Sequence, residues 1–261
     1  MIRNLRIFLA AALLSVSLVS SAQERLLRRP AAEMPYTVDE YGYATYQHMG
    51  FTFKMKENYI STEYGRKGIE RMMDDLEKIS SIIPQDALKV MRSRAIWMEE
   101  NNVHNRSAAW YHTSADYPSS IGDISAKGKC LEITNIEKYV NTTAKNQPFM
   151  VLHELCHLYH DQALGGNSNR DIHAAYLNAK EKGLYKTYWR RGDVANTAAT
   201  ETTYYENEKE HCYCMNNDFE FFAEMCEAYW GENDYFPYDN GDLRNFDPVA
   251  YELMEKIWKR K

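Results

Sequence analysis

Apolar side chains recur along the chain at two spacings, one typical of strands and one typical of helices. In residues 51–56, apolar and polar side chains alternate, which predicts a half-buried strand. Short strands are also expected at residues 43–46, 95–98 and 130–134. Between residues 68 and 83, isoleucine, methionine and leucine recur every three or four positions, which predicts a helix with one apolar face.

The second half of the chain is dominated by the helical spacing. Pro148 precedes an apolar run and suits the first turn of a helix, and Gly165-Gly166 ends the pattern. Three further helices are expected at residues 171–182, 218–230 and 248–259. Strands followed by helices in this order indicate an α+β fold, in which a small mixed β-sheet precedes a mainly helical C-terminal half.

The N-terminus has the composition of a secretory signal peptide. A basic start with Arg3 and Arg6 precedes an apolar run too short to span a bilayer comfortably, and small residues follow that run. We therefore expect residues 1–22 to be a cleaved signal peptide, 23–35 a flexible leader, and 36–261 a single domain. The mature chain is expected to be secreted or periplasmic, without stable membrane insertion.

The chain is mildly acidic, with a formal net charge of −6. Removal of residues 1–22 takes away Arg3 and Arg6 and no acidic residue, which changes this charge to −8. An exported protein of this charge is a poor candidate for binding nucleic acid or an anionic membrane through electrostatics alone.

Five cysteines allow one or two disulfides in an oxidising compartment, and the odd number leaves at least one thiol without an intramolecular partner. Cys212 and Cys214 are too close in sequence to pair easily with each other. No second Cys-x-Cys pair accompanies them to complete a thiolate metal site.

The run His153-Glu154-Leu155-Cys156-His157 contains the pattern His-Glu-x-x-His. In a helix, His153 and His157 lie on one face, one turn apart, so both imidazoles can reach one Zn²⁺ ion. Glu154 can then act on a water molecule bound to that metal. A core helix that carries these three side chains by chance is the alternative, so a third ligand is needed to decide.

Zinc in a hydrolase usually takes three protein ligands and leaves one position for water. We expect His160 to be a core histidine or a partner of a ligand, because it lies one turn further along the helix axis than His157. The candidates for the third ligand are Glu220, Glu224, Glu227, His160, Asp161, His173 and His211.

The predicted helix at residues 218–230 places Glu220, Glu224 and Glu227 on one face, without a nearby lysine or arginine. These carboxylates would repel one another, and a dication would remove the repulsion. One of them can coordinate the metal and another can accept the free N–H of a ligand histidine. The alternative is a solvated acidic stripe, in which Glu220 is the partner of an Asn217 cap.

Two further segments have open interpretations. Residues 101–128 are expected to form long loops, in which His112 bonds to the backbone rather than lining a cleft. The strand at residues 130–134 is either an exposed sheet edge, to which an extended peptide can add, or an ordinary internal strand.

The His153–His157 motif, followed by Asn217-Asp218-Phe219-Glu220-Phe221-Phe222-Ala223-Glu224, resembles the catalytic domain of the anthrax lethal factor family of zinc peptidases. The resemblance covers roughly residues 148–237 and implies a zincin-like metallopeptidase domain. It implies that Glu220 is the third zinc ligand and that Glu224 supports a ligand histidine. Tyr213, seven residues before Glu220, matches a tyrosine that assists catalysis. The long segment between the two helices and the cysteines that flank Tyr213 depart from the family pattern.

These observations predict a secreted zinc-dependent endopeptidase that acts on peptides or proteins. His153, His157 and Glu220 would hold Zn²⁺, Glu154 would act as the general base, and Tyr213 would help to stabilise the oxyanion. The alternatives are a zinc amidase that acts on cell-wall peptides and a non-catalytic, zinc-stabilised binding protein. A purely structural zinc site has no use for Glu154.

Overall fold

The computed structural model of the protein describes residues 33–104, 107–186, 188–190, 203–205 and 212–259. The predicted signal peptide, most of the predicted leader, and the candidate ligand His211 lie outside these residues. The chain divides between Pro35 and Tyr36, and residues 36–261 form one unit. Within the described ranges, no helix is both long enough and apolar enough to cross a membrane.

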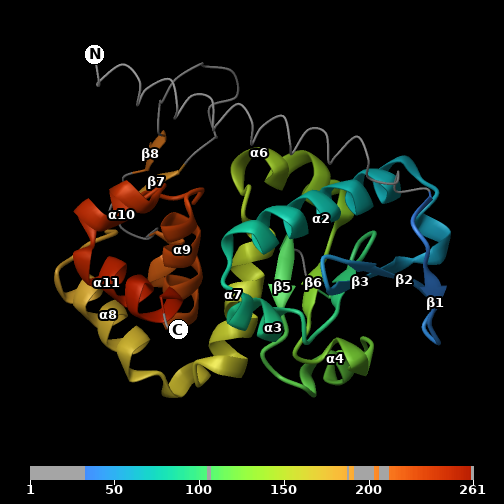
Figure 1. Ribbon diagram of the computed structural model, residues 1–261, viewed down its shortest axis with the longest axis horizontal. Helices are drawn as coiled ribbons and strands as arrows, with labels where there is room; N and C mark the ends of the chain where they lie inside the picture. The colour runs from blue at the N-terminus through green and yellow to red at the C-terminus, as the bar shows by residue number, and fades with distance from the viewer. Residues whose placement is uncertain (1–32, 105–106, 187, 191–202, 206–211, 260–261) are drawn as a thin grey trace, which may run out of the picture. The chain divides into compact units, whose positions relative to one another are not determined.

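The short strands assemble into a six-stranded mixed sheet in the order β1-β2-β3-β4-β6-β5 (Figure 1). β1, β2 and β3 are antiparallel neighbours, β3, β4 and β6 run parallel, and β5 runs antiparallel to β6. The strands are β1 Thr37–Val38, β2 Tyr43–His48, β3 Phe51–Lys56, β4 Ile96–Met98, β5 Ala109–Tyr111 and β6 Leu131–Ile133.

Burial along the strands follows the alternation seen in the sequence. In β3, Phe51, Phe53 and Met55 are fully buried, whereas the residues between them are partly exposed. β6 lies between β4 and β5, so it is an internal strand and the alternative of an exposed edge at residues 130–134 is wrong. Beyond β6 the sheet ends at β5, which lies inside the stretch that we expected to be loop.

The predicted first helix is α2, Glu63–Ile82, which begins at the cap of Thr62 and ends before Pro84. Its apolar stripe is buried against the rest of the unit. Gly68 faces Ile136, Met55 and Met98, and a Cβ atom at this position would lie 2.8 Å from Ile136. The helix therefore packs close to the sheet because this position carries no side chain. α3, Gln85–Met91, follows it.

The helix that carries the His-Glu-x-x-His motif is α7, Met150–Ala163. Gly165, with φ +88°, follows the helix in the left-handed conformation that suits a helix end. α7 contacts β5 and β6 of the sheet and also packs against α9, so it lies between the sheet and the C-terminal helices (Figure 1). The motif is therefore enclosed on two sides.

The C-terminal half is helical, as predicted. α9 begins at Asn217, whose side chain accepts a hydrogen bond from the Glu220 N–H, and ends at Gly231, where φ is +111°. The principal helices here are α8 Arg170–Glu181, α9 Asp218–Trp230, α10 Asn240–Phe246 and α11 Pro248–Trp258. α10 was not predicted. The described fold is a mixed α+β structure.

Several shorter elements connect these strands and helices. They are η2 Glu57–Tyr59, α4 Tyr117–Ser120, η3 Ser125–Lys127, α5 Ile136–Lys138, η4 Tyr139–Thr143, α6 Ala144–Asn146, η5 Gly166–Ser168, β7 Tyr188–Arg190, β8 Thr203–Tyr205 and η6 Tyr213–Met215. β7 and β8 pair as a separate two-stranded antiparallel sheet.

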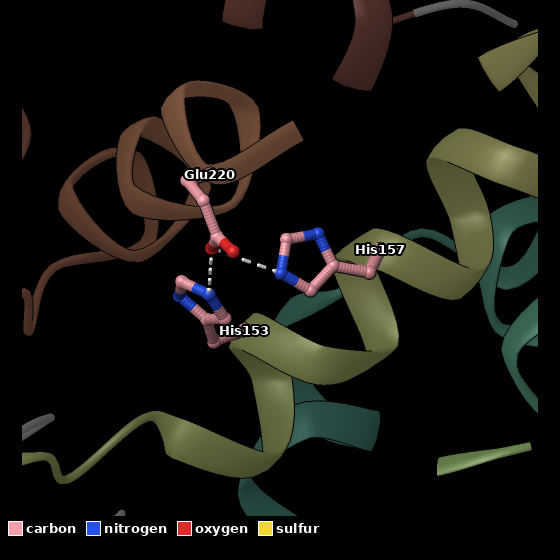
Figure 2. Close-up of side chains that lie close together, drawn as sticks. All are labelled: His153, His157 and Glu220. Atoms are coloured by element: carbon pink, nitrogen blue, oxygen red, sulfur yellow. Dashed lines mark hydrogen bonds and ion pairs between the residues drawn. The ribbon is translucent and has the colours of Figure 1, made fainter. Parts of the chain in front are cut away.

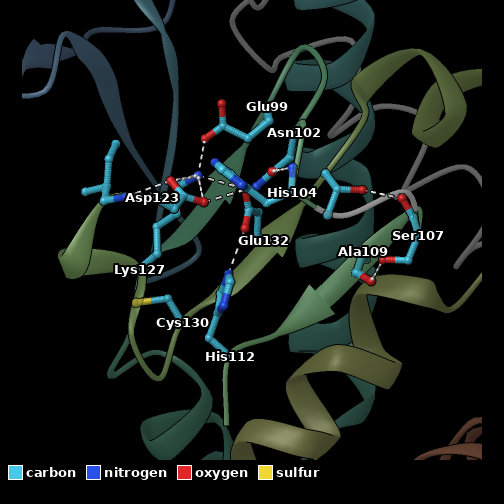
Figure 3. A network of polar contacts seen from close by, with 12 residues as sticks. Glu99, Asn102, His104, Ser107, Ala109, His112, Asp123, Lys127, Cys130 and Glu132 are labelled. Carbon is cyan, nitrogen blue, oxygen red and sulfur yellow. Dashed lines mark hydrogen bonds and ion pairs between the residues drawn. The ribbon is translucent and has the colours of Figure 1, made fainter. Parts of the chain in front are cut away.

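A buried ionic cluster fixes the connection that leads to β5 (Figure 3). Glu132 of β6 is fully buried, and Lys127 Nζ lies 2.7 Å from its Oε1. The same ammonium group lies 2.8 Å from Glu99 and 3.0 Å from Asp123. The Asn102 amide also donates to Glu132 Oε1, at 2.5 Å. We call these five residues the Glu132 cluster.

His112 contacts the same cluster. Its Nε2 lies 2.7 Å from Glu132 Oε2, and its ring is buried. The expectation that His112 bonds to the backbone is therefore wrong, because its side chain pairs with a carboxylate that the sequence does not mark as buried. This contact connects the residue that follows β5 to β6.

Candidate metal centre

The two histidines of the motif and Glu220 converge between α7 and α9 (Figure 2). Glu220 Oε2 lies 3.0 Å from His153 Nε2 and 3.2 Å from His157 Nε2. The two imidazole rings are 4.7 Å apart and nearly perpendicular. The helical period places both histidines on one face of α7, and the Asn217 cap starts α9 so that Glu220 lies in its first turn.

This geometry fits a metal ion bound by three protein atoms. Ligand atoms about 2.1 Å from a tetrahedral metal are about 3.4 Å from one another. The separations of Glu220 Oε2 from the two imidazole nitrogens, 3.0 and 3.2 Å, need only a small expansion to reach this arrangement. All three side chains are at most one-fifth exposed. His153, His157 and Glu220 are therefore arranged to hold a metal ion.

The other nitrogen of His153 is held by a carboxylate on the same face of α9. His153 Nδ1 lies 2.6 Å from Glu227 Oε1 but 4.0 Å from Glu224 Oε1. The hydrogen-bond partner of the histidine is therefore Glu227, in place of the Glu224 that we predicted. Such a bond fixes the tautomer of the ring and directs its Nε2 lone pair toward the metal position.

The contacts within the site shift the pKa values of its members in opposite directions. Burial alone would lower the pKa of His153, but the hydrogen bonds with Glu220 and Glu227 outweigh it and raise that pKa. Burial would raise the pKa of Glu220, yet the two histidines hold it well below its usual range. The carboxylate is thus ionised and ready to bind a cation.

Glu154 is buried beside the candidate ligands and lies near the backbone of Tyr111 in β5. Burial raises the pKa of Glu154 above its ordinary value. A carboxyl group in this position can exchange a proton with a water molecule near the metal position.

Tyr213 lies in η6 and also reaches the site. Its hydroxyl donates to Glu220 Oε1 at 3.2 Å, and its ring centre is 6.1 Å from that of His153. The side chain is 42% exposed, so it lines the opening of the site rather than its floor. Burial of the hydroxyl and the nearby Glu220 raise the pKa of Tyr213, so the hydroxyl keeps its proton at neutral pH.

The cysteines that flank Tyr213 are in contact but form no disulfide, as expected from their closeness in sequence. Their Sγ atoms lie 3.1 Å apart, and both thiols are free. All five cysteines are buried free thiols in this structure. Among the described residues, the disulfides that composition allowed are therefore not formed.

The remaining candidate ligands lie elsewhere. His160 is fully buried against the rings of Phe219 and Phe222, and burial lowers its pKa to about 4, as for a core histidine. Asp161 accepts hydrogen bonds from the Tyr111 hydroxyl at 2.7 Å and from Lys129 at 2.8 Å. The exposed His173 lies 3.0 Å from Asp218.

Two cavities open onto the site. The larger, of about 510 Å³, is lined by Trp110 and Tyr111 of β5, by His157 and by Glu220. The smaller, of about 300 Å³, extends toward the beginning of α7. Both cavities include Glu154 and Tyr213, so they meet at the predicted catalytic groups.

Comparison of the chain with protein-family models, with curated proteins and with solved structures gives no match. The resemblance to the lethal factor family therefore remains a prediction from the two helix motifs.

Proposed function

We propose that this protein is a zinc-dependent endopeptidase. The main support is the convergence of His153, His157 and Glu220, because two imidazoles and one carboxylate are a ligand set that zinc hydrolases use. A buried carboxyl group, Glu154, lies beside these ligands, where a general base is needed. The three ligands leave a coordination position for water, which a closed structural site does not.

In the proposed mechanism, bound Zn²⁺ would supply Lewis acidity that brings the pKa of a water molecule toward neutrality. Glu154 accepts the proton from the attacking water and delivers it to the leaving amine. The Tyr213 hydroxyl donates a hydrogen bond to the oxyanion that develops on the peptide carbonyl. Glu227 keeps His153 oriented throughout the reaction.

A peptide substrate is supported by the edge strand beside the site. β5 lines the larger cavity and is the last strand of the sheet. An extended peptide can add to such an edge through its own backbone groups. Tyr111 of this strand and Glu154 both line the larger cavity, so the strand lies within reach of the proposed general base. The strand-addition surface that we considered at residues 130–134 is thus proposed for β5.

The decisive experiment replaces Glu154 with glutamine. We expect Glu154→Gln to lower turnover of a peptide library by about 10²–10⁴-fold, because the base is lost while the size of the side chain is kept. The content of bound zinc, measured by elemental analysis, should not change. Glu252→Gln makes the same chemical change at an exposed position of α11 and should leave the rate unaltered. Normal turnover by Glu154→Gln would refute the mechanism.

The proposed role of Tyr213 is tested by Tyr213→Phe, which removes one hydroxyl. Loss of a single oxyanion donor is expected to lower kcat by about 10²–10³-fold at constant zinc content. Tyr36, which is also 42% exposed, offers the matched control Tyr36→Phe. Equal rates for the two variants would assign Tyr213 to a role outside catalysis.

The same assays address the two alternatives. Cleavage of purified cell-wall fragments in preference to peptides would favour an amidase. A zinc-loaded protein that cleaves neither substrate, with Glu154 intact, would favour a binding protein.

A further inference from the structure

The smaller cavity next to the metal centre has an unusual chemical lining. It is formed by the segment before β5, the beginning of α7, η6 and the inner face of α9. Three carboxylates line it, those of Glu154, Glu224 and Glu227. Among the described residues that line this cavity, none is a lysine or an arginine.

One of these carboxylates is incompletely satisfied. Glu224 is only 2% exposed, and no described residue donates a hydrogen bond to its Oε2. Its charged neighbours include the acids Asp234 and Glu227. A buried carboxylate oxygen without a donor costs free energy, and adjacent acids add to this cost. A cationic group that entered the cavity would supply both the missing donor and the opposite charge.

The cavity also has room for more than an ion. Its volume is about 300 Å³, and its wall includes the apolar groups of Ala108, Met150 and Tyr235. Lysine and arginine side chains combine an aliphatic stem with a charged head that donates several hydrogen bonds. The apolar wall suits such a stem, and the carboxylates suit the head.

We propose that this cavity is a specificity pocket for a lysine or arginine side chain of the substrate, within two residues of the cleaved bond. The position follows from the connection of the two cavities, which share Ala109, Glu154 and Tyr213. This inference rests on the proposed peptidase function and names its preferred substrate, a basic peptide. Glu224 and Glu227 are the residues that determine the preference.

The first test is cleavage of a peptide library by the zinc-loaded protein. The cleaved bonds should have lysine or arginine at one fixed position within two residues of the cut. For matched peptides with lysine or norleucine there, kcat/KM should favour lysine by about tenfold or more. Cleavage without any basic preference would overturn the pocket and leave the peptidase assignment intact. If no peptide is cleaved, the proposed function fails. The pocket is then tested by the binding affinities of the lysine and norleucine peptides, measured by fluorescence anisotropy, and equal affinities would overturn it.

A pair of substitutions at Gln147 tests the pocket away from the metal ligands. Gln147 is partly buried and lines the cavity. Gln147→Glu should raise the ratio of lysine to norleucine cleavage, and Gln147→Lys should lower it, because the two changes place opposite charges in the same wall. Glu224→Gln should lower the ratio by about tenfold, whatever it does to the overall rate. A ratio that stays constant in all three variants would overturn the proposal.

Metal analysis separates this pocket from a second metal site, because His153, Glu224 and Glu227 also lie close enough to share an ion. We expect one zinc ion per chain in both the natural protein and Glu224→Gln. Two ions in the former and one in the latter would identify the cavity as a metal site instead.

Discussion

Two groups of carboxylates, one around Glu132 of β6 and one on α9, differ in how their charge is balanced. In the Glu132 cluster, Lys127 pairs with Glu99, Asp123 and Glu132 at 2.7–3.0 Å. On α9, the contacts of Glu220 and Glu227 are made with His153 and His157, and no described lysine or arginine forms an ion pair with them. The first group therefore surrounds an ammonium group of the chain, whereas the second has only imidazole partners.

This difference helps to separate a structural cluster from a binding site. Buried charges are stable when paired and hydrogen bonded, and costly when they are left alone. The Glu132 cluster meets this requirement within the fold and holds the connection to β5. The acids of α9 meet it only partly, which leaves them able to bind a cation that comes from outside the chain.

The largest expected effect comes from removing the internal cation. Lys127→Met leaves buried acids without their partner and is expected to reduce the free energy of unfolding by about 3–5 kcal/mol, measured by chemical denaturation. Lys256→Met breaks an ion pair with Asp171 in which both side chains are more than half exposed, and should cost less than about 1 kcal/mol. Equal losses in the two variants would show that the Glu132 cluster is not the paired structure described above.

An intermediate effect is expected at the partner of the ligand histidine. Glu227→Gln weakens the bond to His153 Nδ1 and should lower zinc affinity by about 10–100-fold, measured by competition with a chelator. Glu224→Gln is the matched control on the same helix face, and it should change zinc affinity less, because Glu224 lies 4.0 Å from that nitrogen. A larger loss of zinc affinity in Glu224→Gln than in Glu227→Gln would show that Glu224 supports the histidine, as the sequence suggested.

The smallest effect is the pH dependence of the metal-free protein. Burial would raise the pKa of Glu132, but contacts with His112 and Lys127 lower it, so its contribution to stability is lost as pH falls through the folded-state value. Burial, Asp234 and Glu227 raise the pKa of Glu224. The contribution of Glu224 to stability is therefore full below the ordinary glutamate pKa. It is lost as pH rises through the pKa that Glu224 has in the folded protein.

Denaturation at a series of pH values between about 3 and 8, which spans the ordinary carboxyl and histidine pKa values, measures both trends. Glu224→Gln should remove part of the decrease in stability toward high pH, and Glu132→Gln should remove part of the decrease toward low pH. If stability depends on pH in the same way in Glu224→Gln and in the unchanged protein, the raised pKa of Glu224 is contradicted.

The residues of the candidate metal centre could be predicted from the sequence because most of their geometry is set within single helices. His153 and His157 are one helical turn apart, and Asn217 and Gly231 mark the two ends of the helix that carries Glu220. Which of Glu224 and Glu227 bonds to His153 could not be predicted from the sequence of one helix. Both lie on the same face of α9, and the way α7 packs against α9 decides which of them reaches His153.

The Glu132 cluster was not predicted, because its members come from separate segments between residues 99 and 132 and each is an ordinary polar residue in the sequence. Its existence explains the error at His112, whose partner is Glu132 rather than the backbone. The edge strand was missed for a related reason. β5 has only three residues, and its pairing with β6 gives no periodic signal in a stretch of that length.

The position of α7 limits where this protein can change during evolution. Residues 150–158 of the helix are all buried between two neighbours, so a substitution there disturbs the packing of both. The cleft walls formed by β5 and η6 include partly exposed side chains, among them Trp110 and Tyr213. Homologues that keep the same chemistry but recognise different partners should therefore diverge in these walls, while the helix that they surround stays nearly constant.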